Sequence, residues 1–177
     1  VVELEEENYY FKLKDHQPWL IDHIERNPAF ISPDARRNEV LGFLRNNVLE
    51  DLCISRPATR LNWGIPLPFD SDYVTYVWFD ALANYITIPA AQGDPGVPGP
   101  LRPPVPPGGH PLPLWPADVH LIGKDIVKFH AVYWPIMLKA MGVPLPRQVL
   151  VHGWWQKDGQ RMSKSTGNVV DPVAVID

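Results

Sequence analysis

Apolar residues recur at intervals of three and four positions in two segments near the start of the chain. In the first segment, Trp19, Leu20 and Ile24 follow Asp15, a residue type that caps helices, and Asn27 precedes a proline. Residues at this spacing share one face of a helix. The pattern therefore predicts an amphipathic helix that begins at Asp15 and ends near Asn27.

The second helical segment begins with Ser32 and Pro33. Serine is a favoured N-cap residue, and proline is favoured at the first helical position. Val40 and Leu44 then lie on one helical face. We expect a second helix that runs to about Asn47.

The rest of the chain alternates between strand-like and helix-like segments. Residues 55–70 hold three prolines and predict a loop, whereas residues 73–79 are rich in Tyr, Val and Thr and predict a buried strand. The further expected elements are a helix from Asp80, a strand at 119–122, a helix at 125–141 that Pro135 kinks or shifts, a strand at 148–151 and a hairpin at 154–160 with an Asp-Gly turn. Alternating strands and helices predict an α/β fold with a parallel sheet and crossover helices.

Prolines are concentrated in one part of the sequence. The chain has 21 prolines, and ten of them lie in residues 93–116 together with five glycines. This segment has too few donors and packing side chains for a helix or a strand. We expect an extended, largely polyproline II insert.

Composition and charge narrow the class of protein. With 45% hydrophobic and 20% charged residues, the 177-residue chain is neither disordered throughout nor a fibre. Its net charge of -4 argues against a general polyanion-binding domain, and no apolar run is long enough to cross a membrane. Cys53 is the only cysteine, which excludes an internal disulfide and a cysteine-based zinc cluster.

Both ends of the sequence resemble segments from the interior of a longer chain. The first residues lack an initiator Met, a basic region and an apolar region, so they form neither a signal peptide nor a transit peptide. The last residues stop inside an apolar segment. We expect the chain to be a fragment.

Candidate chemistry lies where the predicted strands end, because parallel sheets bind ligands at the carboxyl ends of their strands. Gly123 and Asp125 follow one strand and could approach a nucleotide, or they could only turn the chain and cap a helix. His130, Trp78 and Tyr85 could equally be core residues. The serines and cations of residues 161–168 are typical of a phosphate-binding loop or of a solvated basic turn.

A resemblance to a known family decides between these alternatives. Residues 153–172, which contain Arg-Met-Ser-Lys-Ser-Thr-Gly-Asn, resemble the Lys-Met-Ser-Lys-Ser region of class I aminoacyl-tRNA synthetases. Residues 76–87 (Tyr-Val-Trp-Phe-Asp-Ala-Leu-Ala-Asn-Tyr-Ile-Thr) and 122–130 (Ile-Gly-Lys-Asp-Ile-Val-Lys-Phe-His) resemble the methionyl-tRNA synthetases among them. Residues 36–40, 54–57 and 63–66 also look like that family.

The resemblance implies the C-terminal half of the catalytic domain. Its fold would be α/β, the second half of a Rossmann-type parallel-sheet nucleotide-binding domain, preceded by two helices and followed by the start of the stem-contact region. Residues 1–60 would be the end of a connective insertion and the return to the catalytic fold. Residues 61–153 would be the second half of the Rossmann domain, with the proline-rich insert at 93–116, and residues 154–177 the loop and the start of the stem-contact region.

The family's site residues carry over at the matching positions. The resemblance implies that the methionine pocket is lined by Trp78, Ala81, Leu82, Tyr85, Phe129 and His130. It implies ATP contacts from Gly123 and Asp125 to the ribose, His152 and Gly153 near the adenine, and Arg161 and Lys164 near the phosphates, with Lys164 also catalytic. ATP and substrate-bound Mg²⁺ are the implied cofactors, and no protein metal ligands are expected.

The implied activity is that of a methionine–tRNA ligase, with L-methionine, tRNA(Met) and the upstream half of the same catalytic domain as partners and no membrane contact. Two departures from the family pattern matter: Arg161 stands where the loop has its first lysine, and the family's His-Ile-Gly-His element is absent. We therefore expect the fragment alone to be inactive.

Several alternatives stay open at this point. The chain could be another class I synthetase (for Leu, Ile or Val), a synthetase-like regulator without activity, or an interaction protein that uses the proline-rich insert. The sequences of the matching blocks resemble bacterial and mitochondrial members of the family more than eukaryotic cytosolic ones. The proline-rich insert favours a fungal-type enzyme of the mitochondrial matrix, with the bacterial cytoplasm as the alternative.

Overall fold

The computed structural model describes residues 6–75, 78–91, 114–163, 165, 167–171 and 173–176. Most of the proline-rich insert, for which we expect polyproline II, lies outside the described residues, as does Lys164.

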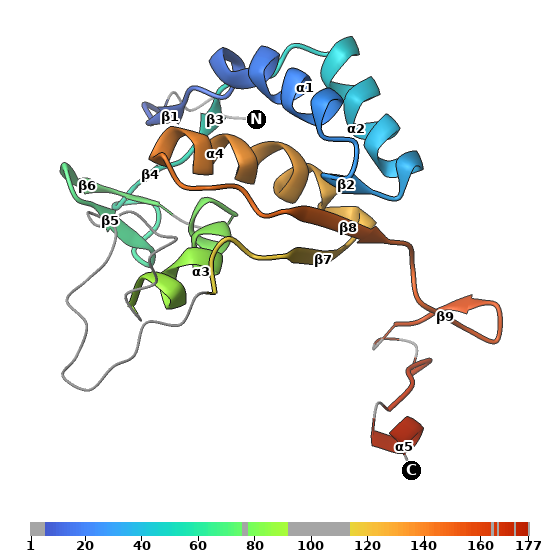
Figure 1. The fold of residues 1–177 in the computed structure, drawn as a ribbon. Coiled ribbons are helices and arrows are strands. Elements are labelled where there is room, and N and C mark those ends of the chain that lie inside the picture. Colours follow the sequence, from blue (N-terminus) through green and yellow to red (C-terminus); the bar gives the residue numbers. More distant parts are fainter. Residues whose placement is uncertain are drawn as a thin grey trace, which may run out of the picture.

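A three-stranded parallel sheet in the order β2-β8-β7 forms the centre of the fold (Figure 1). The strands are β2 (Ile31–Ser32), β7 (Val119–Gly123) and β8 (Gln148–His152), so the two strands expected near 119–122 and 148–151 are confirmed. Strands β7 and β8 pair over their whole length. The predicted α/β class with a parallel sheet is therefore correct.

Within the part of the chain that the structure describes, helices cover one face of this sheet and side chains of the opposite face are exposed. Alternate side chains of β7 and β8, such as Ile122 and Val149, are buried in a core shared with the helices, whereas Val119 and Leu121 on the opposite face are exposed. The core includes buried residues of α1 (Gln17–Arg26) and α2 (Asp34–Asn46). Because side chains alternate along a strand, one face of each strand lies under these helices and the other does not.

The two N-terminal helices are confirmed, but both begin later than expected. Asp15 lies in a 3₁₀ turn, Lys14–His16, and gives no side-chain cap to α1. Ser32 belongs to β2, where it pairs with Leu150, and the carbonyl of Pro33 accepts the first backbone hydrogen bonds of α2. Pairing with the sheet draws Ser32 out of the helix, which a local capping signal cannot reveal.

The buried strand predicted for residues 73–79 is wrong in its bounds and its environment. The strand is β6 (Asp70–Thr75), and it pairs antiparallel with β4 (Arg56–Pro57) and β5 (Ile65–Leu67) in a separate small sheet. The expected loop at 55–70 thus contains two short strands. Only Val74 of β6 is buried, and helix α3 (Trp78–Ala91) already begins at Trp78, ahead of Asp80.

The helix expected at 125–141 is present as three consecutive pieces. A 3₁₀ turn (Lys124–Ile126) leads into a π-helical segment (Phe129–Tyr133) and then into α4 (Trp134–Met141). A proline lacks an N–H and its ring clashes with the carbonyl four residues earlier. The π-helical segment, which is wider than an α-helix, ends directly before α4 and its Pro135. This is the shift of the helix that Pro135 predicts.

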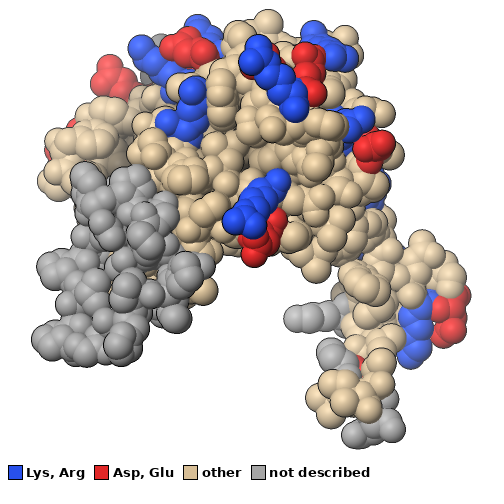
Figure 2. Space-filling view, in the orientation of Figure 1, with Lys and Arg blue, Asp and Glu red and all other residues tan. Residues whose placement is uncertain are grey.

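A second core and a projecting C-terminal arm complete the molecule. The second core joins α3, through Leu82 and Ile86, to Trp115 and α4. The expected hairpin is confirmed as β9 (Gln156–Lys157) and β10 (Gln160–Arg161), with positive φ at Asp158 and Gly159 as a tight turn requires. The hairpin and α5 (Val173–Ile176) project away from the body (Figures 1 and 2).

The remaining short elements and the surface charges add little to the site. Strands β1 (Tyr10–Phe11) and β3 (Leu52–Cys53) pair beside the helical layer. Figure 2 shows acidic and basic side chains interspersed over one face of the body. None of the helices in the described part of the chain combines the length and the apolar character that a membrane span requires.

Candidate functional site

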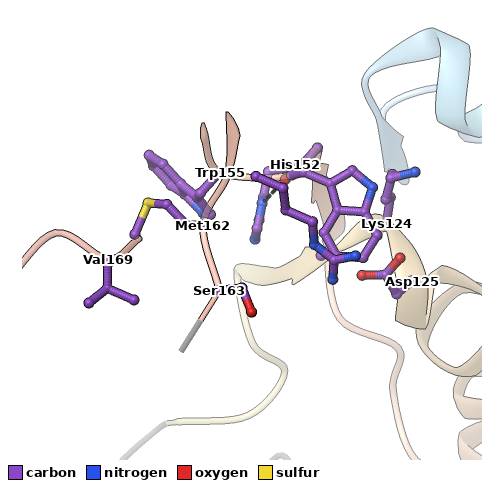
Figure 3. A pocket seen from close by; sticks show the side chains of 11 residues that line it. Lys124, Asp125, His152, Trp155, Met162, Ser163 and Val169 are labelled. Atoms are coloured by element: carbon purple, nitrogen blue, oxygen red, sulfur yellow. Dashed lines mark hydrogen bonds between the residues drawn. The ribbon is translucent and has the colours of Figure 1, made fainter. Parts of the chain in front are cut away.

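A cleft of about 310 Å³ opens where the carboxyl ends of β7 and β8 meet the projecting hairpin (Figure 3). Each wall of this cleft comes from a different element: the end of β7 and its 3₁₀ turn, the end of β8, and the hairpin with the loop that follows it. Its lining consists of Gly123, Lys124, Asp125, His152, Gly153, Trp154, Trp155, Arg161, Met162, Ser163 and Val169. All the expected nucleotide-side residues that the structure describes are among them.

Gly123 is not required by the packing of the chain itself. Its φ of -73° is open to any residue, so the backbone conformation does not require glycine at this position. A methyl group added at Gly123 would lie 3.8 Å from Cε1 of His152, which is ordinary contact. The missing side chain therefore leaves room on the side of the cleft.

Asp125 lies at the cleft with an exposed carboxylate (Figure 3). It occupies the middle of the 3₁₀ turn, whose N-cap is Gly123, and no side chain caps that turn. The alternative in which Asp125 is a helix cap is therefore wrong. Its carboxylate is oriented to accept hydrogen bonds from a molecule in the cleft.

Cations and an aromatic ring form the hairpin side of the cleft. The guanidinium Cζ of Arg161 lies 3.0 Å from the ring centroid of Trp154, and Nζ of Lys124 lies 4.9 Å from the same centroid. Cations at such distances are attracted to the ring face. Trp155 lies beside His152, with ring centroids 5.7 Å apart.

Sequence reasoning missed part of this lining, above all Trp154, Trp155 and Lys124. The signal that could have found the two tryptophans is their place between the end of a strand and an Asp-Gly turn. Residues that directly follow a strand of a parallel sheet lie at the edge where such sheets bind ligands, so the first residues after β8 are expected beside the cleft.

A second cluster lies beyond the 3₁₀ turn and brings four of the expected methionine-side residues together. The rings of Trp78 and Phe129 stack with centroids 4.0 Å apart, and Trp78 meets His130 edge-on at 6.4 Å. Tyr85 lies 5.6 Å from His130. Helix α3 supplies Trp78 and Tyr85, and the π-helical segment supplies the other two rings.

The hydrogen bonds of His130 define its protonation. Its Nδ1 lies 2.9 Å from the carbonyl oxygen of Ile126, which can only accept, so Nδ1 carries the proton. Burial lowers the pKa of His130, although the bond to Ile126 acts in the opposite direction. In the neutral ring Nε2 is then the acceptor, and the Tyr85 hydroxyl donates to it over 2.8 Å.

The two other expected pocket residues lie on α3 in different environments. Leu82 is buried in the second core, beneath the cluster, whereas Ala81 is exposed. Burial raises the pKa of Tyr85, which keeps its hydroxyl protonated as a donor. Sequence reasoning missed His120 and Trp134, whose rings also contact Tyr85.

The loop expected to hold Lys164 is closed by its flanking residues. The backbone N–H of Ser163 donates to the carbonyl of Asn168 over 3.2 Å, and the two form an isolated antiparallel bridge. The hydroxyls of Ser163 and Ser165 are 2.8 Å apart. Lys164 itself lies outside the described residues.

Comparison with known proteins gives a consistent match. A family model described as "tRNA synthetases class I (M)" matches residues 2–97 and 112–177. The chain is 49% identical over 179 residues to the methionine–tRNA ligase of Clostridium tetani, a match that covers 100% of this chain and 25% of the relative. It is 46% identical to the probable mitochondrial methionine–tRNA ligase of Neurospora crassa, which covers 96% of this chain and 25% of the relative.

Among solved structures, the chain matches Mycobacterium tuberculosis methionyl-tRNA synthetase bound by methionyl-adenylate, with a TM-score of 0.76 and 44% sequence identity. The match covers 97% of this chain and 31% of that chain. This chain thus spans a quarter to a third of the length of these relatives.

Proposed function

The chain belongs to the family of class I tRNA synthetases described above, and from that premise we propose that it supplies half of an active site that joins L-methionine to tRNA(Met) with ATP. The observation that carries the proposal is one segment of chain, residues 123–130, that connects the cleft to the aromatic cluster. Gly123 and Asp125 line the cleft, and His130 in the cluster is bonded back to Ile126 between them. Such a connection suits a reaction between a nucleotide and a small amino acid.

The methionine side chain would occupy the aromatic cluster. A thioether is polarizable and makes favourable contacts with aromatic rings, each worth about 0.3–1.5 kcal/mol. Trp78, Tyr85 and Phe129 provide such rings, and Ala81, Leu82 and His130 complete the proposed pocket. The hydrogen-bonded pair of Tyr85 and His130 would give one wall of the pocket a fixed polar edge.

ATP would occupy the cleft. Asp125 would accept hydrogen bonds from the ribose hydroxyls, Gly123 would leave room for the sugar, and His152 and Gly153 would lie near the adenine. Arg161 and Lys164 would contact the phosphates. The positions of Gly123, Asp125, His152, Gly153 and Arg161 on the cleft support this assignment.

The first step would form methionyl-adenylate. A carboxylate oxygen of methionine attacks the α-phosphorus of ATP, the bond from that phosphorus to the β-phosphate oxygen breaks, and pyrophosphate leaves. Mg²⁺ would enter as the counter-ion of the ATP phosphates. Positioning and charge neutralisation would provide the catalysis.

The second step would transfer methionine to tRNA. A hydroxyl of the terminal adenosine attacks the adenylate carbonyl and releases AMP. Arg161 of the projecting hairpin lines the cleft, and we propose that the hairpin guides this end of the tRNA. We also propose that residues 1–60, 61–153 and 154–177 correspond to the end of a connective insertion, the second half of the Rossmann domain and the loop with the start of the stem-contact region.

A chimeric enzyme tests the proposed function. This chain replaces the matching quarter of the Clostridium tetani relative, and amino-acid-dependent exchange between pyrophosphate and ATP is measured. We expect exchange with methionine and not with leucine, isoleucine or valine, and none from the 177-residue chain alone. A folded chimera that responds to one of those other amino acids, or to none, contradicts the proposal.

The cellular compartment is a finer question. Similar proteins include bacterial enzymes and a fungal one named as mitochondrial. We propose the mitochondrial matrix, and subcellular fractionation of the source cells with an antibody against this chain tests it. Recovery outside mitochondria contradicts this placement without affecting the proposed reaction.

A further inference from the structure

His120 is a buried histidine that has no role in the reaction as described. It is the second residue of β7 and has 5% of its surface exposed, on the face of the strand that packs against the helices. The next buried residue on that face is Ile122. Burial of a polar ring costs free energy unless its hydrogen bonds are formed, so a histidine at this core position needs a specific partner.

The partner is the indole of Trp134. Its Nε1, which can only donate, lies 3.2 Å from Nε2 of His120, and Trp134 is itself fully buried. The bond requires a neutral His120 with its proton on Nδ1. Burial, together with the nearby His130, lowers the pKa of His120 to about 4, which keeps it neutral.

The ring of His120 in turn supports Tyr85. The two ring centroids are 4.2 Å apart, closer than any other ring contact of Tyr85, and the Tyr85 hydroxyl donates to His130. Tyr85 therefore contacts both histidines, whose own ring centroids are 6.4 Å apart. An ordered series of contacts therefore runs from Trp134 through His120 and Tyr85 to His130.

We propose that His120 is a positioning residue that holds the Tyr85 ring where its hydroxyl reaches His130. The bond to Trp134 fixes the His120 ring, and the fixed ring sets the tilt of Tyr85. This inference rests on the proposed function, in which Tyr85 and His130 line the methionine side chain. It goes further because His120 would act on selectivity for a sulfur atom without touching the substrate.

Two substitutions separate the two properties of His120. His120→Phe keeps a ring of similar size and removes the acceptor for Trp134. His120→Gln removes the ring and keeps a carbonyl oxygen that can accept from the indole. Leu121→Ala is the matched control, since Leu121 is the next residue of β7 and lies on the exposed face.

The first measurement uses the chimera, with methionine and norleucine, in which a methylene replaces the sulfur. We expect His120→Phe to raise the methionine KM about tenfold and to lower selectivity against norleucine by a similar factor, with kcat and the ATP KM within about twofold. His120→Gln should show a smaller loss, and Leu121→Ala none. A His120→Phe enzyme with unchanged methionine KM and selectivity overturns the proposal.

The second measurement needs no activity and uses the 177-residue chain. Nitrogen-15 NMR of the His130 ring reports which nitrogen carries the proton and whether the other accepts a hydrogen bond. We expect His120→Phe to move the Nε2 resonance of His130 toward its unbonded value, His120→Gln to move it less, and Leu121→Ala to leave it unchanged. An unmoved Nε2 resonance in His120→Phe overturns the proposal. This outcome is independent of the proposed function, which is contradicted separately when the unmodified chimera shows no activity with methionine.

Discussion

Gly123 and His152 pair directly across β7 and β8, at the carboxyl end of each strand. The pairing places a residue without a side chain beside an imidazole at the ligand edge of a parallel sheet. Neither the backbone conformation of Gly123 nor its packing requires glycine, because an added methyl group would only touch the edge of the His152 ring. The space above Gly123 is therefore available to a ligand.

Gly123→Ala should separate binding from stability. At a position that alanine can adopt without strain, the change reduces the entropy of the unfolded chain and stabilises by about 0.4–1 kcal/mol. We expect a free energy of unfolding that is unchanged or slightly higher, together with a raised ATP KM in the chimera. Gly42→Ala is the control, since Gly42 lies in α2 with open space around it, and it should leave the ATP KM unaltered. Loss of stability in Gly123→Ala would contradict this account of the glycine.

Asp125→Asn should lower adenylate formation without unfolding the protein. The substitution keeps the shape of the side chain and removes the charge that would strengthen its bonds to ribose hydroxyls, a difference of about tenfold in binding. Asp125 caps no helix and is exposed, so the thermal midpoint should stay near that of the unmodified protein. Rapid-quench measurement of adenylate formation and a thermal scan test both halves of the prediction. A large fall in the midpoint with normal adenylate formation would point to a structural role.

The sequence predicted the helices better than the strands, for a physical reason. Helical periodicity is local, so the apolar positions of α1 and α2 are visible over ten or more residues. A two-residue strand such as β2 exists only because β8 lies beside it, more than a hundred residues along the chain. The same is true of β4 and β5, whose pairing with β6 depends on contacts outside their own sequence.

The site residues that lie in the segments resembling the family could be predicted from the sequence, and the others could not. Trp78, Tyr85 and His130 follow from the resemblance, and the structure brings them into one cluster. His120 could have been noticed as the one polar side chain in an otherwise apolar strand, but apolar residues lie on both faces of this strand, so its sequence does not reveal which face is buried. Its partner Trp134 comes from another element, so the pair appears only in three dimensions.

Trp78→Ala should weaken methionine binding selectively. The indole stacks on Phe129 at 4.0 Å, and its removal takes away one aromatic contact of the thioether and lets the Phe129 ring move into the space. We expect the methionine KM of the chimera to rise about tenfold or more, with little change in ATP affinity measured without methionine. Equilibrium binding of each ligand tests this. If the binding of ATP and of methionine weakens equally, the substitution disturbs the fold in general and not the methionine pocket.

The stability of the chain should depend on pH through His120. Its pKa is about 4 in the folded chain and near 6.5 when unfolded, so between these values the unfolded state binds more protons. The contribution is complete above pH 6.5 and is lost as the pH falls toward 4. From pH 7.5 to pH 5 the free energy of unfolding should drop by about 2 kcal/mol from this group.

Urea unfolding of the chain at these two pH values measures the effect. His120→Phe cannot titrate, so its unfolding free energy should lose most of this pH dependence. Tyr85 and His130 face the same ring, and the pKa of His130 is also lowered by burial, which leaves a smaller slope of the same sign. Identical pH profiles for the variant and the unmodified chain would show that His120 is not buried as a neutral ring.

The last prediction concerns the two cations of the phosphate-side loop, Arg161 and Lys164. In the transition state of adenylation, negative charge builds on the departing pyrophosphate, and loss of one preorganised contact to such charge typically slows a reaction by about 10²–10³. The guanidinium of Arg161 already lies against the face of Trp154 in the protein without ligand. A contact with the phosphates would have to weaken this favourable stacking, so the net gain from Arg161 would be smaller. We therefore expect Lys164→Ala to slow adenylate formation in the chimera by about this factor, and Arg161→Ala to slow it less.

Transfer from preformed adenylate to tRNA should change little in Lys164→Ala, because pyrophosphate has already left. Trp154→Leu is the matched control for Arg161, because it removes the ring on which the guanidinium stacks. Arg161 keeps its charge in this variant, so adenylate formation should stay faster than in Lys164→Ala. Rapid-quench measurement of the two steps separates them. Loss of an interaction that is made only in the transition state lowers kcat and leaves methionine affinity unaltered. A costlier Arg161→Ala, or a Lys164→Ala that slows only transfer, would contradict the assignment of Lys164 as the cation that stabilises the departing pyrophosphate.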